Sequence, residues 1–427
     1  MTIDHIAAIR PGDADYDSAR ATKYDTGTPA LILQPTSPGE VAESVRHAQA
    51  EGLPIAVRNG GHNALSYGTI DDGLIIDLSK LDQVEILGDH RVRIGGGATW
   101  GPSATELGKH GLAISSGDTL SVGVGGLTQA GGIGWMVRKH GLALDNLLAA
   151  EVVTASGDVV RASAAENEDL FWGLRGGAGN FGVVTALEFQ AQPVTTVHFG
   201  TIEYALEDLD QLVKGWAATM RTAPDEFTAT LALRPAFGPF PAAAILFLCL
   251  AGDDLAAIEP FRAIGKVVAE DISEHVYAEV LEEGPPHQEV TPVIGNAFVE
   301  SVDEPLITAV TEAYSAGGRV VFLRGLGGAY GRVDPSATAF AHRRAEALIV
   351  SAAFMNPEST DADFEHARAV WRTIGDQGFG SYSGFLGSDT AEDIAALWPK
   401  DTLDRLREVK RAWDPDNVFR RNFNIAP

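Results

Sequence analysis

The spacing of apolar residues predicts an amphipathic helix near the N-terminus. Val41, Val45 and Ala48 recur on one helical face, Ser37 stands at the N-cap of an S-x-x-E box, and Gly52 ends the pattern. Short apolar runs bounded by turn residues predict strands after it, at 54–57, 74–78, 84–87, 92–94, 151–155, 159–161 and 182–190, with a further helix at 99–110. This part of the chain is therefore β-rich, with short strands.

The pattern changes after Gln192-Pro193, where proline interrupts a strand and the glycines become sparse. Longer apolar runs alternate here with amphipathic segments. They predict strands at 228–233, 242–250, 319–323 and 347–353, and helices at 205–221, 253–268, 303–316 and 361–376. Long strands with helices grouped between them indicate a second domain of the α+β class.

Charge and cysteine content exclude several classes of function. The 427 residues carry a formal net charge of −26, which repels phosphate backbones and anionic membranes, so we expect neither a nucleic-acid nor a membrane partner. Cys249 is the single cysteine, which excludes an intrachain disulfide and a cysteine zinc cluster. The longest apolar run, 242–251, is too short to span a bilayer, and the N-terminus lacks a secretory signal pattern. We expect a soluble, cytoplasmic protein.

Glycine is enriched and clustered. It makes up 47 of the 427 residues and six of the twelve residues from Gly123 to Gly134. Without a Cβ the backbone can approach a flat or anionic ligand and direct N–H groups at it. The alternative is a series of tight turns, which is the better interpretation for any single glycine. The second glycine loop, Asn59-Gly60-Gly61-His62, directly follows a predicted strand and favours the ligand interpretation.

The segment from Gly177 to Gly182 matches G-x-G-x-x-G, but its context is wrong for a nicotinamide dinucleotide. That fingerprint needs a strand before it and a helix after it. Here FWGLR precedes the glycines and the β-rich VVTALEF follows. The block at Gly123 also misses the pattern, because Thr128 occupies the last glycine position. The sequence therefore argues against NAD binding.

Five motifs in this order resemble the FAD-linked oxidases of the vanillyl-alcohol oxidase superfamily, in the berberine-bridge-enzyme-like branch. The motifs are Arg58-Asn59-Gly60-Gly61-His62-Asn63, the block Val122 to Gly134, Asp145-Asn146, Gly179-Asn180-Phe181-Gly182-Val183-Val184 and the tail from Asp414 to Ile425. The resemblance implies a two-domain α+β fold of the FAD-binding PCMH/VAO type, with an antiparallel substrate sheet covered by helices. It divides the chain into an FAD-binding domain (1–195), a substrate-binding domain (196–385) and a C-terminal segment that returns to the first domain (386–427).

The resemblance also implies that FAD is bound covalently, through the flavin 8α-methyl and His62. A neutral imidazole is nucleophilic near pH 7 and rigid once attached. The further positions that it assigns to the cofactor are Arg58, Asn59, Gly60, Gly61, Asn63, Tyr67, Gly117, Asp118, Val122, Gly123, Gly126, Gly132, Gly134, Asn146, Asn180, Val183, Asn422 and Asn424. For Asn180, fixing its own loop is an equally good interpretation.

Some members carry a second flavin link through a cysteine, and Thr119 occupies that place here. Cys249 lies in an apolar strand of the other domain, so we expect a single covalent link. This weakens the inference toward carbohydrate oxidation, since doubly linked members tend to have open sites for bulky substrates. Val122 occupies the position that gates oxygen in this branch, where valine admits O2; simple packing beside the cofactor is the alternative.

A hydride transfer from C–H next to OH or NH often needs a base for the heteroatom proton. Tyr382 and Tyr330 are the candidates, although a structural role fits each on spacing alone. Related amine oxidases can place a lysine on strand 319–323, where our alignment puts Val321, so we expect that polar contact to be missing. His342-Arg343 could bind an anion or form an ion pair at a helix start. We interpret the Asp414–Asn417 segment as turn chemistry and expect no metal site.

The sequence thus predicts an FAD-dependent oxidase that takes a hydride from a small alcohol or amine and passes the electrons to O2, giving H2O2. The alternatives are a dehydrogenase with a different electron acceptor and a descendant that retains FAD without redox activity. Substrate identity and oligomeric state stay open at this point.

Overall fold

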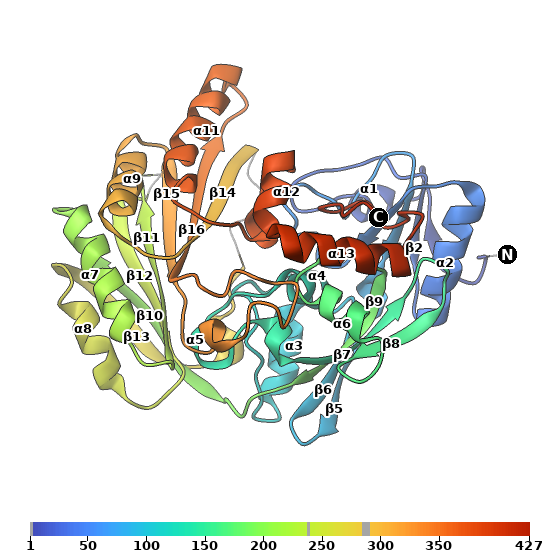
Figure 1. The fold of residues 1–427 in the computed structure, drawn as a ribbon, viewed down its shortest axis with the longest axis horizontal. Coiled ribbons are helices and arrows are strands. Elements are labelled where there is room, and N and C mark those ends of the chain that lie inside the picture. Colours follow the sequence, from blue (N-terminus) through green and yellow to red (C-terminus); the bar gives the residue numbers. More distant parts are fainter. Residues whose placement is uncertain (1–2, 237–239, 284–290) are drawn as a thin grey trace.

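The computed structural model describes residues 3–236, 240–283 and 291–427 and forms two units that lie side by side (Figure 1). The names follow the predicted division: the first unit denotes residues 3–195 together with the C-terminal segment 386–427, and the second unit denotes residues 196–385. The predicted division between 195 and 196 falls where strand β10 begins, at Thr196. Within the described residues, every helix is too short or too polar to cross a membrane.

The first unit contains two sheets. In the smaller one, β2 and β3 pair in parallel with β4 while β1 is antiparallel, in the order β1 (Ala7–Ile9), β2 (Leu31–Gln34), β4 (Leu74–Asp77), β3 (Ile55–Arg58). The larger one is antiparallel, in the order β5 (Val84–Gly88), β6 (Arg91–Gly95), β9 (Val183–Gln190), β7 (Leu147–Val153), β8 (Val159–Ser163). The strands predicted for this part of the chain are confirmed, with shifts at their ends.

Helices fill the space around these sheets. Their bounds are α1 (Tyr16–Ala19), α2 (Pro38–Glu51), α3 (Trp100–Gly108), α4 (Val124–Ala130), α5 (Val137–His140) and α6 (Glu168–Leu174). The predicted first helix is confirmed as α2, with the Ser37 hydroxyl accepting from the Glu40 N–H and Gly52 as a left-handed C-cap. The Glu40 carboxylate accepts a 2.7 Å hydrogen bond from the Thr36 N–H, and not from the Ser37 N–H as in a standard capping box. This satisfies one more amide at the helix start.

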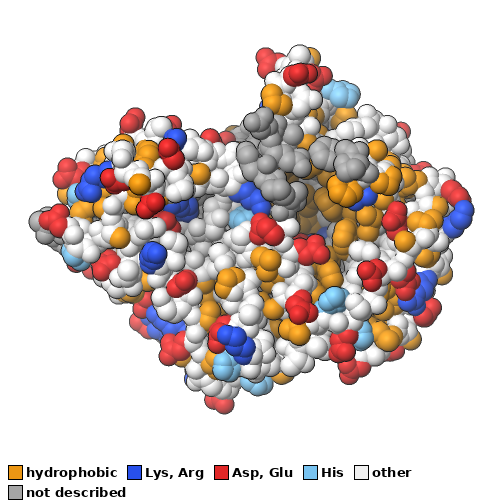
Figure 2. Space-filling model, turned by 180° about the vertical axis from the view of Figure 1, so that it is seen from behind, with side chains coloured by type: hydrophobic (Ala, Val, Ile, Leu, Met, Phe, Trp, Pro, Cys, Tyr) orange, Lys and Arg blue, Asp and Glu red, His pale blue; other side chains and the backbone are white. Residues whose placement is uncertain are grey.

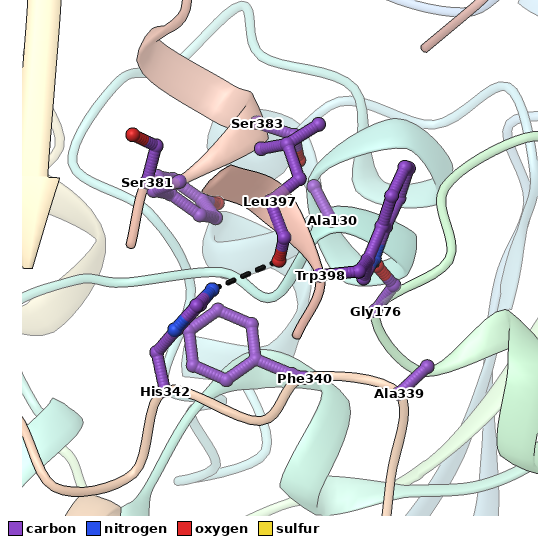
Figure 3. Close-up of a pocket in the computed structure, with 10 residues that line it drawn as sticks. Ala130, Gly176, Ala339, Phe340, His342, Ser381, Ser383, Leu397 and Trp398 are labelled. Atoms are coloured by element: carbon purple, nitrogen blue, oxygen red, sulfur yellow. Dashed lines mark hydrogen bonds between the residues drawn. The ribbon is translucent and has the colours of Figure 1, made fainter. Parts of the chain in front are cut away.

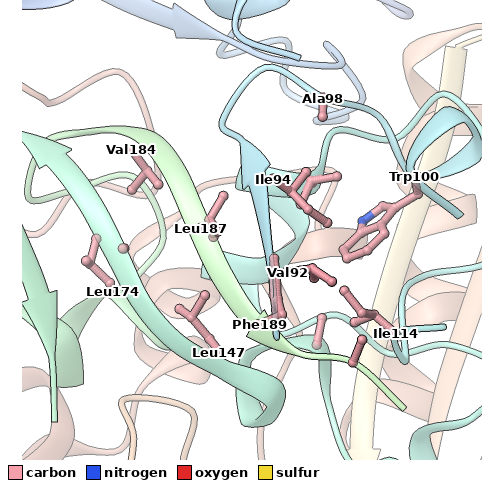
Figure 4. Close-up of a cluster of buried hydrophobic side chains, with 14 of the residues drawn as sticks. Val92, Ile94, Ala98, Trp100, Ile114, Leu147, Leu174, Val184, Leu187 and Phe189 are labelled. Atoms are coloured by element: carbon pink, nitrogen blue, oxygen red, sulfur yellow. The ribbon is translucent and has the colours of Figure 1, made fainter. Parts of the chain in front are cut away.

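The main core of the first unit packs between the antiparallel sheet and the segments around it (Figure 4). Val92 and Ile94 of β6, Leu187 and Phe189 of β9, and Trp100 of α3 are almost completely buried there. The alternation of these residues along β6 and β9 puts one face of each strand into this core. The burial of such side chains stabilises the unit by about 1.5–3 kcal/mol each.

The second unit is built on one antiparallel sheet. Its order is β13 (Val267–Val276), β10 (Thr196–Tyr204), β12 (Ala243–Leu250), β11 (Phe227–Arg234), β15 (Arg319–Gly325), β16 (Ala347–Met355), β14 (Thr291–Val299). The long helices α7 (Leu209–Thr222), α9 (Glu304–Ser315) and α11 (Asp361–Gly375) and the short helix α8 (Glu259–Arg262) lie on the side of the sheet away from the first unit (Figure 1). The short helix α10 (Ala329–Arg332) faces the first unit at α5.

One predicted helix of this unit is confirmed only in part. Within the predicted range 253–268, a 3-10 turn at Leu255–Ile258 and α8 are helical, but α8 ends at Arg262 and the chain enters the edge strand β13 at Val267. Strand β13 is mostly exposed and carries Glu270, Asp271 and Glu274, so it lacks the apolar alternation that marks a half-buried strand. Its pairing with β10 determines its conformation, and that pairing is not local in sequence.

The C-terminal segment contains α12 (Ala391–Leu397), α13 (Lys400–Trp413) and an extended tail. Figure 1 shows α13 along the first unit and α12 between the two units. Lys410 and Asp414, at the end of α13, form a completely buried ion pair of 2.7 Å between Nζ and Oδ2. The Asp414 carboxylate also accepts from the N–H groups of Val418 and Phe419, which confirms the turn interpretation of this acidic segment.

Candidate functional site

The loop that carries His62 begins at the end of β3. Arg58, the last residue of this strand, forms a buried ion pair with Asp77 of the neighbouring strand, at 2.8 Å between Nη2 and Oδ2. Burial alone would raise the pKa of Asp77, but the charge of Arg58 and the hydrogen bonds to the carboxylate outweigh it and lower the pKa. Arg58, predicted as a cofactor residue, thus holds the start of the loop in place.

His62 faces the glycine block, a name that from here on covers residues 117–134, across a short gap. Its Nε2 lies 2.7 Å from the Ser121 hydroxyl. Burial lowers the pKa of His62, the nearby Lys23 charge lowers it further, and Glu283 opposes this only partly. The imidazole is therefore neutral at pH 7, which is the state in which its nitrogen can act as a nucleophile.

Glycine at positions 60 and 123 lets the loop that carries His62 lie directly against the glycine block. A Cβ on Gly60 would lie 2.5 Å from Gly123 N, and a Cβ on Gly123 would lie 2.3 Å from the Asn59 side-chain oxygen. The Asn59 amide donates to the Gly96 carbonyl. The close approach of one backbone to the other, rather than of a ligand, thus requires glycine at both positions.

Other predicted glycines of the block divide into two kinds. Gly117, Gly132 and Gly134 also pack tightly on protein atoms, with a Cβ on Gly134 only 1.8 Å from the Ser116 carbonyl oxygen. Gly126, in contrast, is exposed and has nothing within 4 Å of a Cβ. Helix α4 therefore leaves an open surface beside Gly126, in the part of the block that was predicted to meet the cofactor.

Asn180 holds the C-terminal tail. It is completely buried, its amide donates to the carbonyls of Gly177 (2.9 Å) and Phe423 (3.1 Å), and its side-chain oxygen accepts from Ile425 N (2.9 Å). The Lys410 ammonium adds a hydrogen bond to the Asn180 carbonyl. All of this supports the loop-fixing interpretation of Asn180. The G-x-G-x-x-G segment has α6 before it and β9 after it, so the rejection of a dinucleotide fingerprint there is confirmed.

Several buried side-chain oxygens around the block and the tail have no hydrogen-bond partner among the described residues. They are Asn59 Oδ1, Thr128 Oγ1, Gln129 Oε1, Asn422 Oδ1 and Asn424 Oδ1. Buried polar atoms are normally satisfied, so a group of unsatisfied acceptors marks a place where a ligand supplies donors. FAD offers such donors in its ribityl and ribose hydroxyls and its flavin N3–H, and these residues therefore fit it.

The remaining predicted cofactor residues have structural partners. Tyr67 donates to Asp389 at 2.9 Å and packs edge-on against Phe423. Asn146 donates to the carbonyls of His140 and Leu142. The other predicted positions are located as follows: Gly61 lies against Thr22, Asn63 Oδ1 accepts from Leu65 N, Val122 O accepts from Trp100 N and Val183 is buried in β9.

The two predicted catalytic tyrosines differ in what their hydroxyls do. Tyr330 is completely buried and donates to the His342 carbonyl, which favours the structural role. The Tyr382 hydroxyl accepts from Gly132 N at 3.1 Å, so its own proton is not used by that bond. Burial raises the pKa of Tyr382 to about 12, with the Gly132 amide and Arg324 opposing the shift. At neutral pH this phenol is protonated.

Tyr382 also lines a cavity between the two units (Figure 3). Loop residues Phe340 and His342 close one side of it, and Leu397 and Trp398 close another. His342 Nε2 donates a 2.8 Å hydrogen bond to the Leu397 carbonyl, so Nε2 carries the proton. Arg343, beside it, forms a buried ion pair with Asp145, which confirms the ion pair, but the expected helix start is wrong because this segment is a turn that leads into β16.

The polar residue of β15 that sequence reasoning missed is Arg324. Val321 lies in the apolar core on the helix side of the sheet, whereas Arg324, on the opposite face, reaches Asp118 of the glycine block. Val321 is apolar and buried, so the expectation for its position stays a prediction, and Arg324 supplies a different polar contact from this strand. A second basic residue in the otherwise apolar RVVFLRG run was the available signal.

Neither a second flavin link nor a metal site finds support in the side chains. Thr119 has no thiol, and Cys249 is buried in β12, where burial raises its thiol pKa. Among the described residues, no group of three or more His, Cys, Asp and Glu side chains is arranged to hold a metal ion.

A unit with these loops, coupled to an antiparallel sheet that helices cover, defines an FAD-linked oxidoreductase of the PCMH/VAO type. The FAD binding domain family matches residues 29–163, and the family described as berberine and berberine like matches residues 389–426. The chain belongs to the berberine-bridge-enzyme-like FAD-linked oxidoreductases.

Its relatives include (R)-6-hydroxynicotine oxidase of Paenarthrobacter nicotinovorans, with 33% identity over 98% of this chain and 96% of that protein. The crystal structure of 6-hydroxy-D-nicotine oxidase from Arthrobacter nicotinovorans aligns with a TM-score of 0.88 and 28% identity, covering 99% of this chain and 98% of that one. Glucooligosaccharide oxidase from Acremonium strictum, described with a 6-S-cysteinyl, 8α-N1-histidyl FAD, shares the fold at a TM-score of 0.87 and 24% identity, covering 99% and 98%.

Proposed function

We propose that the protein is an oxidase that takes a hydride from a small alcohol or amine and passes the electrons to O2, giving H2O2. The observation that carries this proposal is the neutral His62 imidazole, held against the glycine block beside unsatisfied buried acceptors. Relatives named as oxidases act on a hydroxynicotine and on oligosaccharides, which spans amine and alcohol chemistry.

FAD, when bound, supplies the hydride acceptor and the route of electrons to oxygen. In this proposal His62 holds it by one covalent bond at the 8α-methyl, and Thr119 leaves the second anchoring position without a thiol. Asn422 and Asn424, on the tail that Asn180 fixes, supply acceptors for its N–H and hydroxyl groups. A single link is in keeping with a small substrate.

Tyr382 is the residue we propose for handling the substrate proton. Its hydroxyl accepts the Gly132 N–H, and both Asp118 and Arg324 act electrostatically on it. Because this phenol is protonated at neutral pH, it relays a proton rather than standing ready as a phenolate base. Val122, at the oxygen-gating position, supports the oxidase over the dehydrogenase alternative.

The acidic surface fits a small-molecule enzyme. Figure 2 shows Asp and Glu side chains spread over one face with Lys and Arg between them, in agreement with the net charge of −26. We propose a cytoplasmic location and no nucleic-acid or membrane partner on this basis.

The test is to mix the purified protein anaerobically with a panel of small secondary alcohols and cyclic amines and to record the flavin absorbance. A substrate bleaches the absorbance near 450 nm, and admitting air restores it with one H2O2 formed per turnover. If the flavin absorbance recovered slowly in air but fast on adding a quinone, the protein would be a dehydrogenase and the oxidase proposal would be wrong. Failure of every compound to bleach the flavin would favour a protein that keeps FAD without redox activity.

A further inference from the structure

The hydrogen bond to Ser121 distinguishes the two nitrogens of His62. Nε2 lies 2.7 Å from the Ser121 hydroxyl, and this is the side-chain hydrogen bond that His62 forms within the described parts of the chain. The ring is half-buried and neutral, so one nitrogen carries a proton and the other a lone pair. Which nitrogen attacks an electrophile therefore depends on the partner of Nε2.

We propose that Ser121 is a positioning residue for flavin attachment: its hydroxyl accepts the Nε2–H, so that Nδ1 keeps the lone pair and forms the covalent bond. The inference rests on the proposed His62 link and adds to it the attacking atom and the residue that selects it. In other functional histidines, a group that hydrogen-bonds the non-reacting ring nitrogen fixes the tautomer and the ring orientation in the same way.

Ser121 is itself held firmly. Its backbone N–H donates to the Glu283 carboxylate at 3.3 Å, and Lys23 pairs with the same carboxylate at 2.9 Å. The backbone N–H of Lys23 donates to the Gly61 carbonyl at 3.2 Å, next to His62. These contacts connect the two loops from both sides, so the distance between the imidazole and the hydroxyl is fixed before the flavin reacts.

The attachment step balances with O2 as the oxidant. A bond forms between Nδ1 and the 8α carbon as one C–H bond of the methyl group breaks, and the Nε2–H bond breaks last, when the alkylated ring gives up its proton. The two electrons and two protons released reduce O2 to H2O2. As Nδ1 becomes alkylated, the ring gains positive character and Nε2–H becomes a stronger donor, so its hydrogen bond to Ser121 strengthens as the reaction proceeds.

The experiment measures covalent incorporation, not turnover. Wild type, Ser121→Ala, Ser121→Thr and the control Ser103→Ala are purified and incubated with FAD in air, and the flavin fraction that stays with acid-precipitated protein is followed over time. Ser103 is a buried serine of α3 whose hydroxyl donates to the Thr99 carbonyl, so it controls for the loss of a buried hydroxyl. We expect Ser121→Ala to slow incorporation about tenfold, and Ser121→Thr and Ser103→Ala to match the wild type.

The attachment atom is read separately, by NMR of the flavin peptide after proteolysis. The expected result for the wild type is a bond at Nδ1. A bond at Nε2, or a Ser121→Ala protein with wild-type rate and wild-type attachment atom, would overturn the proposal. Because the wild-type peptide alone decides the first point, a poorly folded variant does not remove the test. Loss of all colour from the wild-type precipitate would instead disprove the His62 link itself.

Discussion

Arg324 of β15 and Asp118 of the glycine block form an ion pair across the two units, with 2.5 Å between Nη2 and Oδ2. The guanidinium also donates to the Ile133 carbonyl and the Thr230 hydroxyl, and it lies over the Trp135 ring at 5.2 Å. The guanidinium of Arg324 thus connects the seven-stranded sheet to the glycine block and the residues that follow it. This contact places the seven-stranded sheet against the loop that leads to Thr119, Ser121 and Val122.

Replacing Arg324 by Met should loosen this junction. Breaking a buried pair costs about 3–5 kcal/mol, and the partial exposure of Asp118 should reduce the loss to about 1–3 kcal/mol. We expect a lower melting temperature with FAD still bound, measured by flavin fluorescence during heating. Arg332→Met is the matched control, because its pair with Asp225 is largely exposed and should contribute less than about 1 kcal/mol. Equal effects of the two variants would contradict this assignment.

Tyr382→Phe should reduce the rate of flavin reduction by about 10²-fold at unchanged FAD content, because it removes the hydroxyl that relays the proton. Anaerobic stopped-flow absorbance measures this rate directly. For Tyr330→Phe we expect no such loss of rate but a lower free energy of unfolding, by about 1 kcal/mol, because the variant loses the hydrogen bond from the Tyr330 hydroxyl to the buried His342 carbonyl. A Tyr382→Phe protein reduced at the wild-type rate would rule out the proton role.

Asn180→Ala should release the tail. The substitution removes three hydrogen bonds, two of which bind Phe423 and Ile425, at about 1 kcal/mol each. Amide hydrogen exchange at Ile425 should therefore accelerate by at least about tenfold. Protection as strong as in the wild type would show that the Lys410–Asp414 pair alone holds the tail.

The Asp77–Arg58 pair predicts a pH dependence of stability. The folded-state pKa of Asp77 is lowered, so its contribution is complete above the unfolded pKa of about 3.9 and is lost as the pH falls through the folded value. We expect Asp77→Asn to be less stable than the wild type at pH 7, because Arg58 stays buried without its partner, and the difference to shrink toward pH 2. Thermal melts between pH 7 and 2 measure this. A constant difference would contradict the pairing.

Local patterns predicted the elements that depend on local interactions. Helix α2 follows from its cap, its apolar face and its terminal glycine, and β7 and β8 follow from the short apolar runs at 151–155 and 159–161. The motif order was enough to indicate FAD. Partner-dependent features were different: β13 is a strand because β10 pairs with it, and the face on which Arg324 lies depends on a register that only the neighbouring strands fix.

The glycine block shows the same limit at the site. Sequence could identify Gly60 and Gly123 as positions for close approach, but not that each makes room for the other loop. The contact between His62 and Ser121 joins residues 59 positions apart, and it became visible only when both loops were placed. For Asn180, spacing left open whether the side chain contacts the cofactor or fixes its own loop. Its hydrogen bonds to Gly177, Phe423 and Ile425 in the structure support the second interpretation.

The most direct test of the central claim is the absorbance spectrum of the purified protein before and after acid precipitation, with His62→Ala in parallel. We predict a flavin spectrum in the wild type whose yellow colour stays with the pellet, a mass increase equal to one FAD less two hydrogens, and colour released to the supernatant by His62→Ala. Wild-type protein that releases all its flavin on precipitation, or a His62→Ala protein that keeps its flavin covalently, would contradict the assignment of His62 as the attachment site.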